Sequence, residues 1–204
     1  MLIDLIVGAR PNFIKISSII NAINQLDDSE PKLSYRLVHT GQHFDENMSK
    51  FFFIDLGLPH PDIYLHCGGG THAEQTAKIM VEYEKVLRDQ PIDLVLVVGD
   101  VNSTMACAIV AKKLQFKVAH VESGIRSYDR NMPEEINRII TDSITDFFFT
   151  TSENANTNLV SDGISPENIF FVGNTMADTL INYRKKFKRP SFWDKLELSP
   201  GAYF

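Results

Sequence analysis

Short runs of apolar residues alternate along the chain with longer segments in which apolar positions recur every three or four residues. The clearest run covers residues 94–98, and continuous runs of this kind are typical of parallel strands that are covered on both faces. The pattern predicts strands at residues 2–7, 35–39, 94–98, 117–121, 147–150 and 169–172, with a weaker one at 63–65. Helices are predicted between them, at residues 11–25, 46–55, 72–88, 104–114, 133–144, 154–161 and 177–187.

Strands that alternate with helices in this way predict right-handed βαβ units, and hence an α/β fold with a doubly wound parallel sheet. Ligands of such sheets bind at the carboxyl ends of the strands. The residues that directly follow each predicted strand are therefore the candidates for function.

The last stretch of the chain differs from the rest. Residues 190–204 follow the last predicted helix, carry the single tryptophan, Trp193, and close on the sequence SPGAYF. A turn followed by the first residues of a strand suggests a boundary just inside another folded unit. We therefore expect residues 1–189 to form one domain, and residues 190–204 to be a linker and the truncated start of a second domain.

Composition and charge narrow the range of partners. The chain is 44% hydrophobic and 23% charged, which favours an ordered globular protein. Its net charge is −6, and no run of Lys or Arg is long enough to follow a phosphate backbone, so no nucleic-acid partner is expected. The basic cluster at residues 184–189 is interpreted as a solvated helix C-terminus.

Cysteine usage and hydropathy indicate where such a protein would reside. Cys67 and Cys107 stand outside any CxxC pattern, so neither a disulfide framework nor a zinc site is expected, and a reducing cytoplasm fits. Met1 runs straight into the first predicted strand, so we expect no signal peptide. No apolar stretch approaches the ~20 residues that cross a bilayer, so no membrane association is expected.

The first predicted strand is followed by the sequence GARP, with Lys15 one helical turn further on. Arg10 and Lys15 could face a diphosphate beside the helix N-terminus, and Pro11 suits the first helical position. The alternative is a plain strand-to-helix turn with two surface cations. The dinucleotide fingerprint G-x-G-x-x-G is missing, so no bound NAD or other cofactor is expected.

The second predicted strand ends in the sequence HTGQH, which contains Gln42 and His43. Two histidines four positions apart could suggest a metal ion, but Gly41 interrupts any helix and no third ligand is near. We therefore expect a polar loop over the sheet edge and no metal site.

Three carboxylates are expected at one edge of the sheet. Asp100 follows the strand at 94–98, Glu122 follows the strand at 117–121, and Glu134 opens the helix at 133–144. Two of them have a plainer interpretation: Asp100 could cap the next helix, and Asn131 with Glu134 resembles a capping box. Taken together, crowded carboxylates raise one another's pKa, which suits proton transfer near neutral pH.

Two longer motifs carry a resemblance to a known family. They read HVESGIR at residues 120–126 and PEEINR at 133–138, and they occur in order with GARP, TGQH at 40–43, Gly99-Asp100 and GNT at 173–175. From about residue 2 to its end, the chain resembles the first half of the UDP-N-acetylglucosamine 2-epimerase family. The resemblance implies a Rossmann-like N-terminal half of a glycosyltransferase-B-type two-domain fold.

The resemblance also implies roles for individual residues. Asp100, Glu122 and Glu134 match the family's acid–base carboxylates, and Arg10 and Lys15 match residues near the phosphates of the nucleotide sugar. A further set, Gln42, His43 and Arg138, falls among its substrate-binding positions.

The implied activity is a non-hydrolysing epimerase that interconverts UDP-GlcNAc and UDP-ManNAc. Expulsion of UDP from C1, while a carboxylate takes the C2 proton, gives a 2-acetamidoglucal intermediate to which UDP adds again. Other contacts belong to the second domain, so this half alone is expected to be inactive, and the full-length protein to be a homodimer.

Several alternatives stay open. Within the family they are a hydrolysing 2-epimerase and an epimerase of another UDP-2-acetamido sugar. Outside it, a glycosyltransferase of the same architecture or a noncatalytic nucleotide-sugar binding module would share much of the pattern. A binding module is the weaker alternative, because three carboxylates would repel a diphosphate unless they had chemistry to perform.

Overall fold

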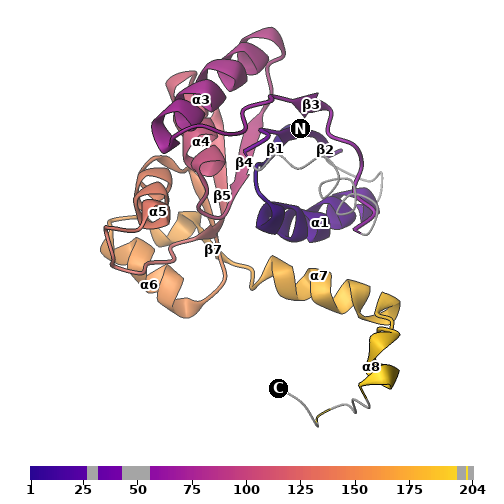
Figure 1. Ribbon diagram of the computed structural model, residues 1–204. Helices are drawn as coiled ribbons and strands as arrows, with labels where there is room; N and C mark the ends of the chain where they lie inside the picture. The colour runs from indigo at the N-terminus through magenta and orange to yellow at the C-terminus, as the bar shows by residue number, and fades with distance from the viewer. Residues whose placement is uncertain (27–31, 43–55, 197–200, 202–204) are drawn as a thin grey trace.

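A parallel sheet forms the centre of the molecule (Figure 1). The computed structural model describes residues 1–26, 32–42, 56–196 and 201. Within them, seven strands lie in the order β3-β2-β1-β4-β5-β6-β7, and every neighbouring pair is parallel. The strands are β1 (Leu2–Val7), β2 (Ser34–His39), β3 (Ile63–Tyr64), β4 (Leu94–Val98), β5 (Lys117–Ser123), β6 (Phe147–Thr150) and β7 (Ile169–Phe171).

Helices cover both faces of this sheet. Those of the described residues are α1 (Arg10–Gln25), α3 (His72–Asp89), α4 (Asn102–Lys113), α5 (Pro133–Ile144), α6 (Glu153–Ser161), α7 (Thr175–Tyr183) and α8 (Phe192–Lys195), with 3₁₀ turns at Pro166–Asn168 and Arg184–Lys186. Helices α3, α4 and α5 pack together along one face, whereas α1 and α7 lie together on the other (Figure 1).

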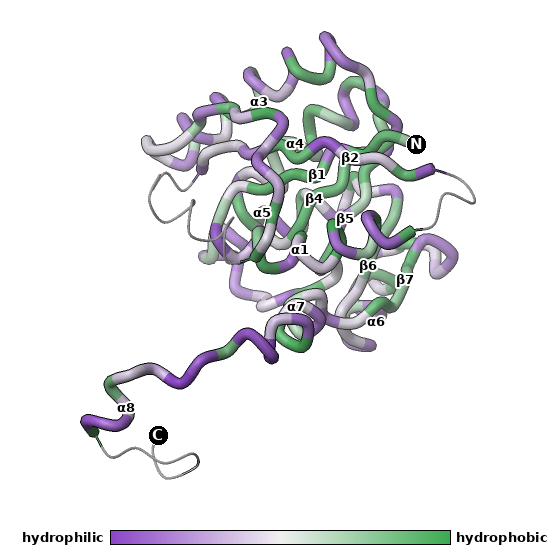
Figure 2. Tube along the Cα trace, turned by 90° about the vertical axis from the view of Figure 1, so that its right-hand side faces the viewer, coloured by the Kyte–Doolittle hydropathy of each residue, from purple (hydrophilic) through white to green (hydrophobic). Residues whose placement is uncertain are grey.

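The strands alternate between two apolar clusters. In β4, Val95 and Val97 pack with α3 and α4, while Leu96 and Val98 pack on the side of α1. The tube coloured by hydropathy shows the same concentration of hydrophobic residues along the central strands (Figure 2). Because both faces are buried, the strand reads as a continuous apolar run, and the predicted doubly wound α/β fold is confirmed.

The predicted elements agree with the structure apart from their ends. Helix α4 begins two residues earlier than predicted, α7 begins earlier because Asn174 accepts a hydrogen bond from the Met176 amide (2.9 Å), and its α-helical part ends at Tyr183. Strand β5 extends beyond the predicted end to Ser123. The helix predicted at 46–55 lies outside the described residues. The division into domains at residue 190 stays a prediction.

A buried ion pair links the first two strands. Asp4 of β1 and Arg36 of β2 stand opposite each other in the sheet register. Arg36 donates to both oxygens of the fully buried Asp4 carboxylate, at 2.7 and 2.9 Å, and the Tyr83 hydroxyl adds a third hydrogen bond at 2.9 Å. Burial raises the pKa of Tyr83, so its hydroxyl stays a donor.

Asp4→Asn should therefore lower the free energy of unfolding by about 3 kcal/mol, because it leaves the Arg36 charge buried without its carboxylate. Chemical denaturation would measure the loss. The control is Arg88→Ala, which breaks the exposed Glu84–Arg88 pair (2.7 Å) on α3 and should cost no more than about 0.5 kcal/mol. Equal costs for the two variants would contradict a structural role for the buried pair.

Candidate active site

The register between β4 and β5 determines which residues meet at the carboxyl edge of the sheet. Val98, the last residue of β4, pairs with Val121 of β5. The residues that follow this pair therefore start at the same level, and Gly99 donates its amide to the Val121 carbonyl (3.0 Å). As a result, Asp100 and Glu122 emerge from neighbouring strands at one edge.

Glu122 occupies a distorted position in β5. Val121 and Ser123 pair with the consecutive residues Phe149 and Thr150 of β6, so Glu122 is an extra residue in a β-bulge. Its φ angle is 71°, in the left-handed region that residues other than glycine seldom adopt. Such backbone strain is concentrated at functional sites.

The Glu122 carboxylate forms an ion pair with Lys15, which α1 brings to the same edge. Both side chains are largely buried, with exposed fractions of 21% and 10%. Gly99 closes over this pair, because a Cβ atom at that position would lie 3.1 Å from Lys15 Nζ and 3.5 Å from Glu122 Oε2. Lys15 and Glu122 thus meet at the carboxyl edge of the sheet, and the roles expected of them stay a prediction.

Asp100 belongs to a second ionic cluster. Arg138 of α5 donates from Nε to Asp100 Oδ2 (3.0 Å) and from Nη1 to Glu135 Oε2 (2.9 Å). Burial by itself would lower the pKa of Arg138, but the two carboxylates outweigh it and raise the pKa. Asp100 does not cap α4, whose N-cap residue is Val101. The plainer interpretation of Asp100 is therefore wrong.

Glu135, rather than Glu134, anchors the start of α5. Glu135 is 1% exposed and accepts hydrogen bonds from the amides of Ser127 (2.9 Å) and Tyr128 (3.0 Å). Glu134 is exposed at the second position of the helix. The capping box suggested for Asn131 and Glu134 does not form, because the N-cap residue is Met132 and Asn131 bonds instead to Asp129.

The crowding of carboxylates expected from the sequence takes a different form. In the described structure Glu122 meets Lys15, Asp100 meets Arg138, and Glu134 faces solvent. At the two strand ends, Glu122 and Asp100 are therefore each paired with a cation and do not crowd each other.

The N-terminus of α1 is organised by a residue that sequence reasoning missed. Asn12 Oδ1 accepts from the amides of Ala9 (2.9 Å) and Gly8 (3.4 Å), while its Nδ2 donates to the Val98 carbonyl (2.8 Å). The helix begins at Arg10, so Pro11 is the second helical residue, not the first. Because Asn12 occupies these two amides, binding of a phosphate here would depend on the cations Arg10 and Lys15.

Gln42, which follows β2, contacts the start of α4. Its side-chain oxygen accepts from the amide (3.0 Å) and the hydroxyl (2.7 Å) of Ser103, at the start of α4. Gly8 is tightly enclosed here, because a Cβ atom on it would lie 2.1 Å from Ser103 Oγ and 2.8 Å from Thr40 Oγ1. His43 lies outside the described residues.

A buried polar cluster beneath the edge was not predicted either. His120 of β5 lies between Asp142 of α5 (2.7 Å) and the Gly99 carbonyl (2.8 Å), and Asp142 also accepts from Arg126 (2.6 Å). Burial alone would raise the pKa of Asp142, but His120 and Arg126 lower it. The feature of the sequence that could have indicated this cluster is His120, a polar residue between apolar ones in the strand.

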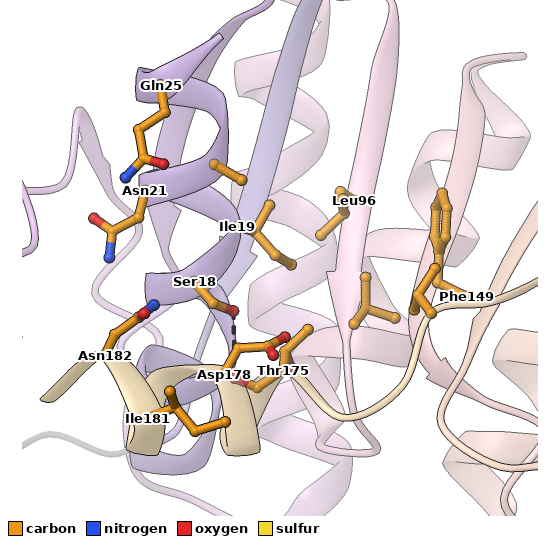
Figure 3. Close-up of a pocket in the computed structure, with 13 residues that line it drawn as sticks. Ser18, Ile19, Asn21, Gln25, Leu96, Phe149, Thr175, Asp178, Ile181 and Asn182 are labelled. Atoms are coloured by element: carbon orange, nitrogen blue, oxygen red, sulfur yellow. Dashed lines mark hydrogen bonds between the residues drawn. The ribbon is translucent and has the colours of Figure 1, made fainter. Parts of the chain in front are cut away.

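A cavity of about 510 Å³ lies elsewhere, between α1, α7 and the sheet (Figure 3). Leu96 and Phe149 contribute apolar walls, and the Ser18 hydroxyl donates to the Thr175 carbonyl at its rim (3.3 Å). None of the predicted site residues that the structure describes lines this cavity. Its volume therefore does not mark the candidate active site.

Two further expectations concern metals and membranes. Among the described residues no three His, Cys, Asp or Glu side chains are grouped as metal ligands would be. None of the helices in the described part of the chain combines the length and apolar content needed to cross a bilayer.

Comparison with known families places this arrangement. The family model described as UDP-N-acetylglucosamine 2-epimerase matches residues 25–203, which include Asp100, Glu122 and the α5 segment. The chain belongs to the UDP-N-acetylglucosamine 2-epimerase family. A UDP-N-acetylglucosamine 2-epimerase of Methanocaldococcus jannaschii is 47% identical over 91% of this chain, and a UDP-2,3-diacetamido-2,3-dideoxy-D-glucuronate 2-epimerase of Pseudomonas aeruginosa is 43% identical over 91%.

Solved structures of the family agree with the fold. The M. jannaschii UDP-GlcNAc 2-epimerase in complex with UDP-GlcNAc and UDP superposes with a TM-score of 0.88 at 44% identity, over 96% of this chain and 53% of that one. A lipopolysaccharide outer core galactosyltransferase shares the fold alone, with a TM-score of 0.56 at 17% identity over 85% of this chain and 46% of that one. The chain spans about half the length of the M. jannaschii and P. aeruginosa relatives, 49% and 52% respectively.

The buried Glu135 provides a test by pH. Burial alone would raise its pKa, but the Ser127 amide, Arg138 and the Tyr128 amide lower it below the ordinary value of 4.5. Its contribution to stability is therefore present above pH 4.5 and is lost as the pH falls through the lower folded-state pKa.

Glu135→Gln should thus cost about 2 kcal/mol at neutral pH and flatten the fall of the unfolding free energy below pH 4.5. Denaturation at a series of pH values would show both effects. The neighbouring Glu134→Gln, at an exposed position, is the matched control. It should change the unfolding free energy by no more than about 0.5 kcal/mol, both at neutral pH and below pH 4.5. Parallel pH profiles for wild type and Glu135→Gln would contradict the assignment.

Proposed function

We propose that this chain forms the N-terminal catalytic half of a non-hydrolysing UDP-N-acetylglucosamine 2-epimerase that interconverts UDP-GlcNAc and UDP-ManNAc. The observation that carries the proposal is Glu122, a carboxylate in a strained bulge and paired with Lys15 at the carboxyl edge of the sheet. Ordinary folding does not require this arrangement. Membership of the family supports a reaction, 2-epimerisation, in which such a carboxylate would act as a base.

The reaction needs a base at a carbon that is not acidic. Glu122 takes the proton from C2 while the bond between C1 and the UDP oxygen breaks, so that the electron pair of the C–H bond forms the C1=C2 double bond of a 2-acetamidoglucal. Return of a proton to the opposite face and re-addition of UDP at C1 give the epimer. No electrons leave the substrate, so the proposal requires no redox cofactor.

The cations have a part in the same step. Lys15, with Arg10 at the first position of α1, would stabilise the charge that develops on departing UDP. A substrate that attracts Lys15 also weakens its hold on Glu122 and so frees the carboxylate to act as a base. Asp100 and Glu134 are proposed as the further acid–base groups, and Gln42, His43 and Arg138 as substrate-binding residues.

A second candidate function differs in the sugar of the substrate. Identity to the P. aeruginosa relative, whose name specifies a diacetamido uronate, is 43%, against 47% for the M. jannaschii relative. Such a small difference does not separate the two substrates. An epimerase of another UDP-2-acetamido sugar is therefore the second candidate function.

The first test uses a protein in which this chain is followed by the C-terminal half that its relatives have. Incubation with UDP-GlcNAc in heavy water should place deuterium at C2 and yield both UDP-linked epimers, followed by proton NMR. Deuterated free N-acetylmannosamine together with UDP would indicate a hydrolysing enzyme instead. Absence of exchange with UDP-GlcNAc and with a panel of UDP-2-acetamido sugars, uronates included, would overturn the proposal.

Glu122→Gln should reduce C2 exchange about 100-fold or more, because an amide cannot accept the proton. Gln can keep the bulge and its φ angle, but Lys15 loses its carboxylate partner, so the variant should stay folded and unfold at a lower denaturant concentration than wild type. The control is Glu167→Gln, an exposed carboxylate in the 3₁₀ turn before β7, which should exchange at the wild-type rate. Wild-type exchange in the Glu122 variant would remove Glu122 from the mechanism.

A further inference from the structure

His120 lies directly beneath the two strand ends that carry the candidate carboxylates. It is fully buried in β5, two residues before Glu122. Its Nδ1 lies 2.7 Å from Asp142 Oδ1, and its Nε2 lies 2.8 Å from the carbonyl oxygen of Gly99, the residue before Asp100. Both distances are those of hydrogen bonds, so both ring nitrogens are engaged.

The two partners of His120 can only accept hydrogen bonds. A backbone carbonyl has no proton to give, so Nε2 must carry the proton in that contact. Asp142 accepts from Arg126 (2.6 Å) and from the Gly124 amide (3.1 Å) through its other oxygen, as an ionised carboxylate does, so Nδ1 must donate as well. A ring that donates from both nitrogens is an imidazolium.

A buried cation needs compensation, and the cluster provides it. His120 and Arg126 contribute two positive charges, while Asp142 and Asp162, which Arg126 also contacts (2.8 Å), contribute two negative ones. The charges balance within one connected network. The arrangement is therefore consistent with the rule that buried charges are paired and hydrogen-bonded.

The Gly99 peptide is the point on which this network acts. Its amide donates to the Val121 carbonyl (3.0 Å) and its carbonyl accepts from His120, so β5 fixes both ends of the residue. Gly99 adopts a φ of 69°, packs over the Lys15–Glu122 pair and leads directly into Asp100. A change in the position of this peptide would move both candidate carboxylates relative to each other.

We propose that His120 is a positioning residue that acts as a buried imidazolium and locks the Gly99 carbonyl, thereby setting Asp100 against Glu122 for proton transfer at the substrate. The effect of His120 on proton transfer rests on the proposed function. The charge and contacts of the ring are independent of that function and are tested separately.

The charge is tested on the wild-type protein at neutral pH without any substrate. Nitrogen-15 NMR of the full-length protein, selectively labelled at histidine, should show protons on both ring nitrogens of His120. Replacement of His120 assigns the signal. A ring with a single proton would overturn the proposal, whatever the enzyme proves to catalyse.

Positioning is tested with two amide substitutions that each preserve one contact. The nitrogen of Gln in His120→Gln can take the place of Nε2 and donate to Gly99, whereas that of Asn in His120→Asn replaces Nδ1 and reaches only Asp142. We expect kcat for C2 exchange to stay within about threefold of wild type for Gln and to fall more than about tenfold for Asn, with KM nearly unchanged in both.

Equal losses in the two variants, or a larger loss for Gln, would show a merely structural histidine and overturn the proposal. Should the Asn variant fail to fold, the Gln variant alone decides: a kcat reduced more than about tenfold, at unchanged KM, contradicts the role. Lack of exchange in the wild type would refute the proposed function instead, and the NMR result would still stand.

Discussion

The pairing of β4 with β5 is the constraint on which the candidate site depends. Because Val98 stands opposite Val121, Asp100 and Glu122 follow that pair at nearly the same level on neighbouring strands. The other elements add to this frame. Helix α1 delivers Lys15 from one side, and α5 delivers Arg138 from the other. A shift of one residue in this register would separate the carboxylates and turn buried side chains towards the wrong face.

The ion pairs of the molecule fall into two groups, one buried in the core and one at the carboxyl ends of the strands. The Asp4–Arg36 pair is buried within β1 and β2, before the carboxyl ends of these strands, so it belongs to the core. The pairs of Lys15 and Arg138 lie at the strand ends, partly accessible, where an incoming anion can compete for the cation. Accessibility thus separates ion pairs that hold the fold from those that a ligand can rearrange.

Much of the fold could be predicted from the sequence, because each buried strand is a local apolar run and each helix has its own periodicity. The edge bearing Asp100 and Glu122 followed from the same logic, since parallel strands end together. What could not be predicted depends on contacts distant in the sequence. The partnership of His120 with Asp142, the choice of Glu135 over Glu134 as the buried acid, and the bond of Asn12 to β4 all require the packed structure. Helix ends were missed by a few residues because caps such as Asn174 compete with neighbouring candidates of similar type.

The bulge at Glu122 has a consequence for how such a protein would respond to selection. The ladder to β6 runs through Val121 and Ser123, so the sheet gains nothing from the residue between them. A left-handed backbone is adopted most easily by glycine and then by asparagine or aspartate. Selection for stability alone would favour such a residue at position 122 wherever the relief of backbone strain exceeds the loss of the Lys15 ion pair, and those variants would keep the fold without the proton acceptor.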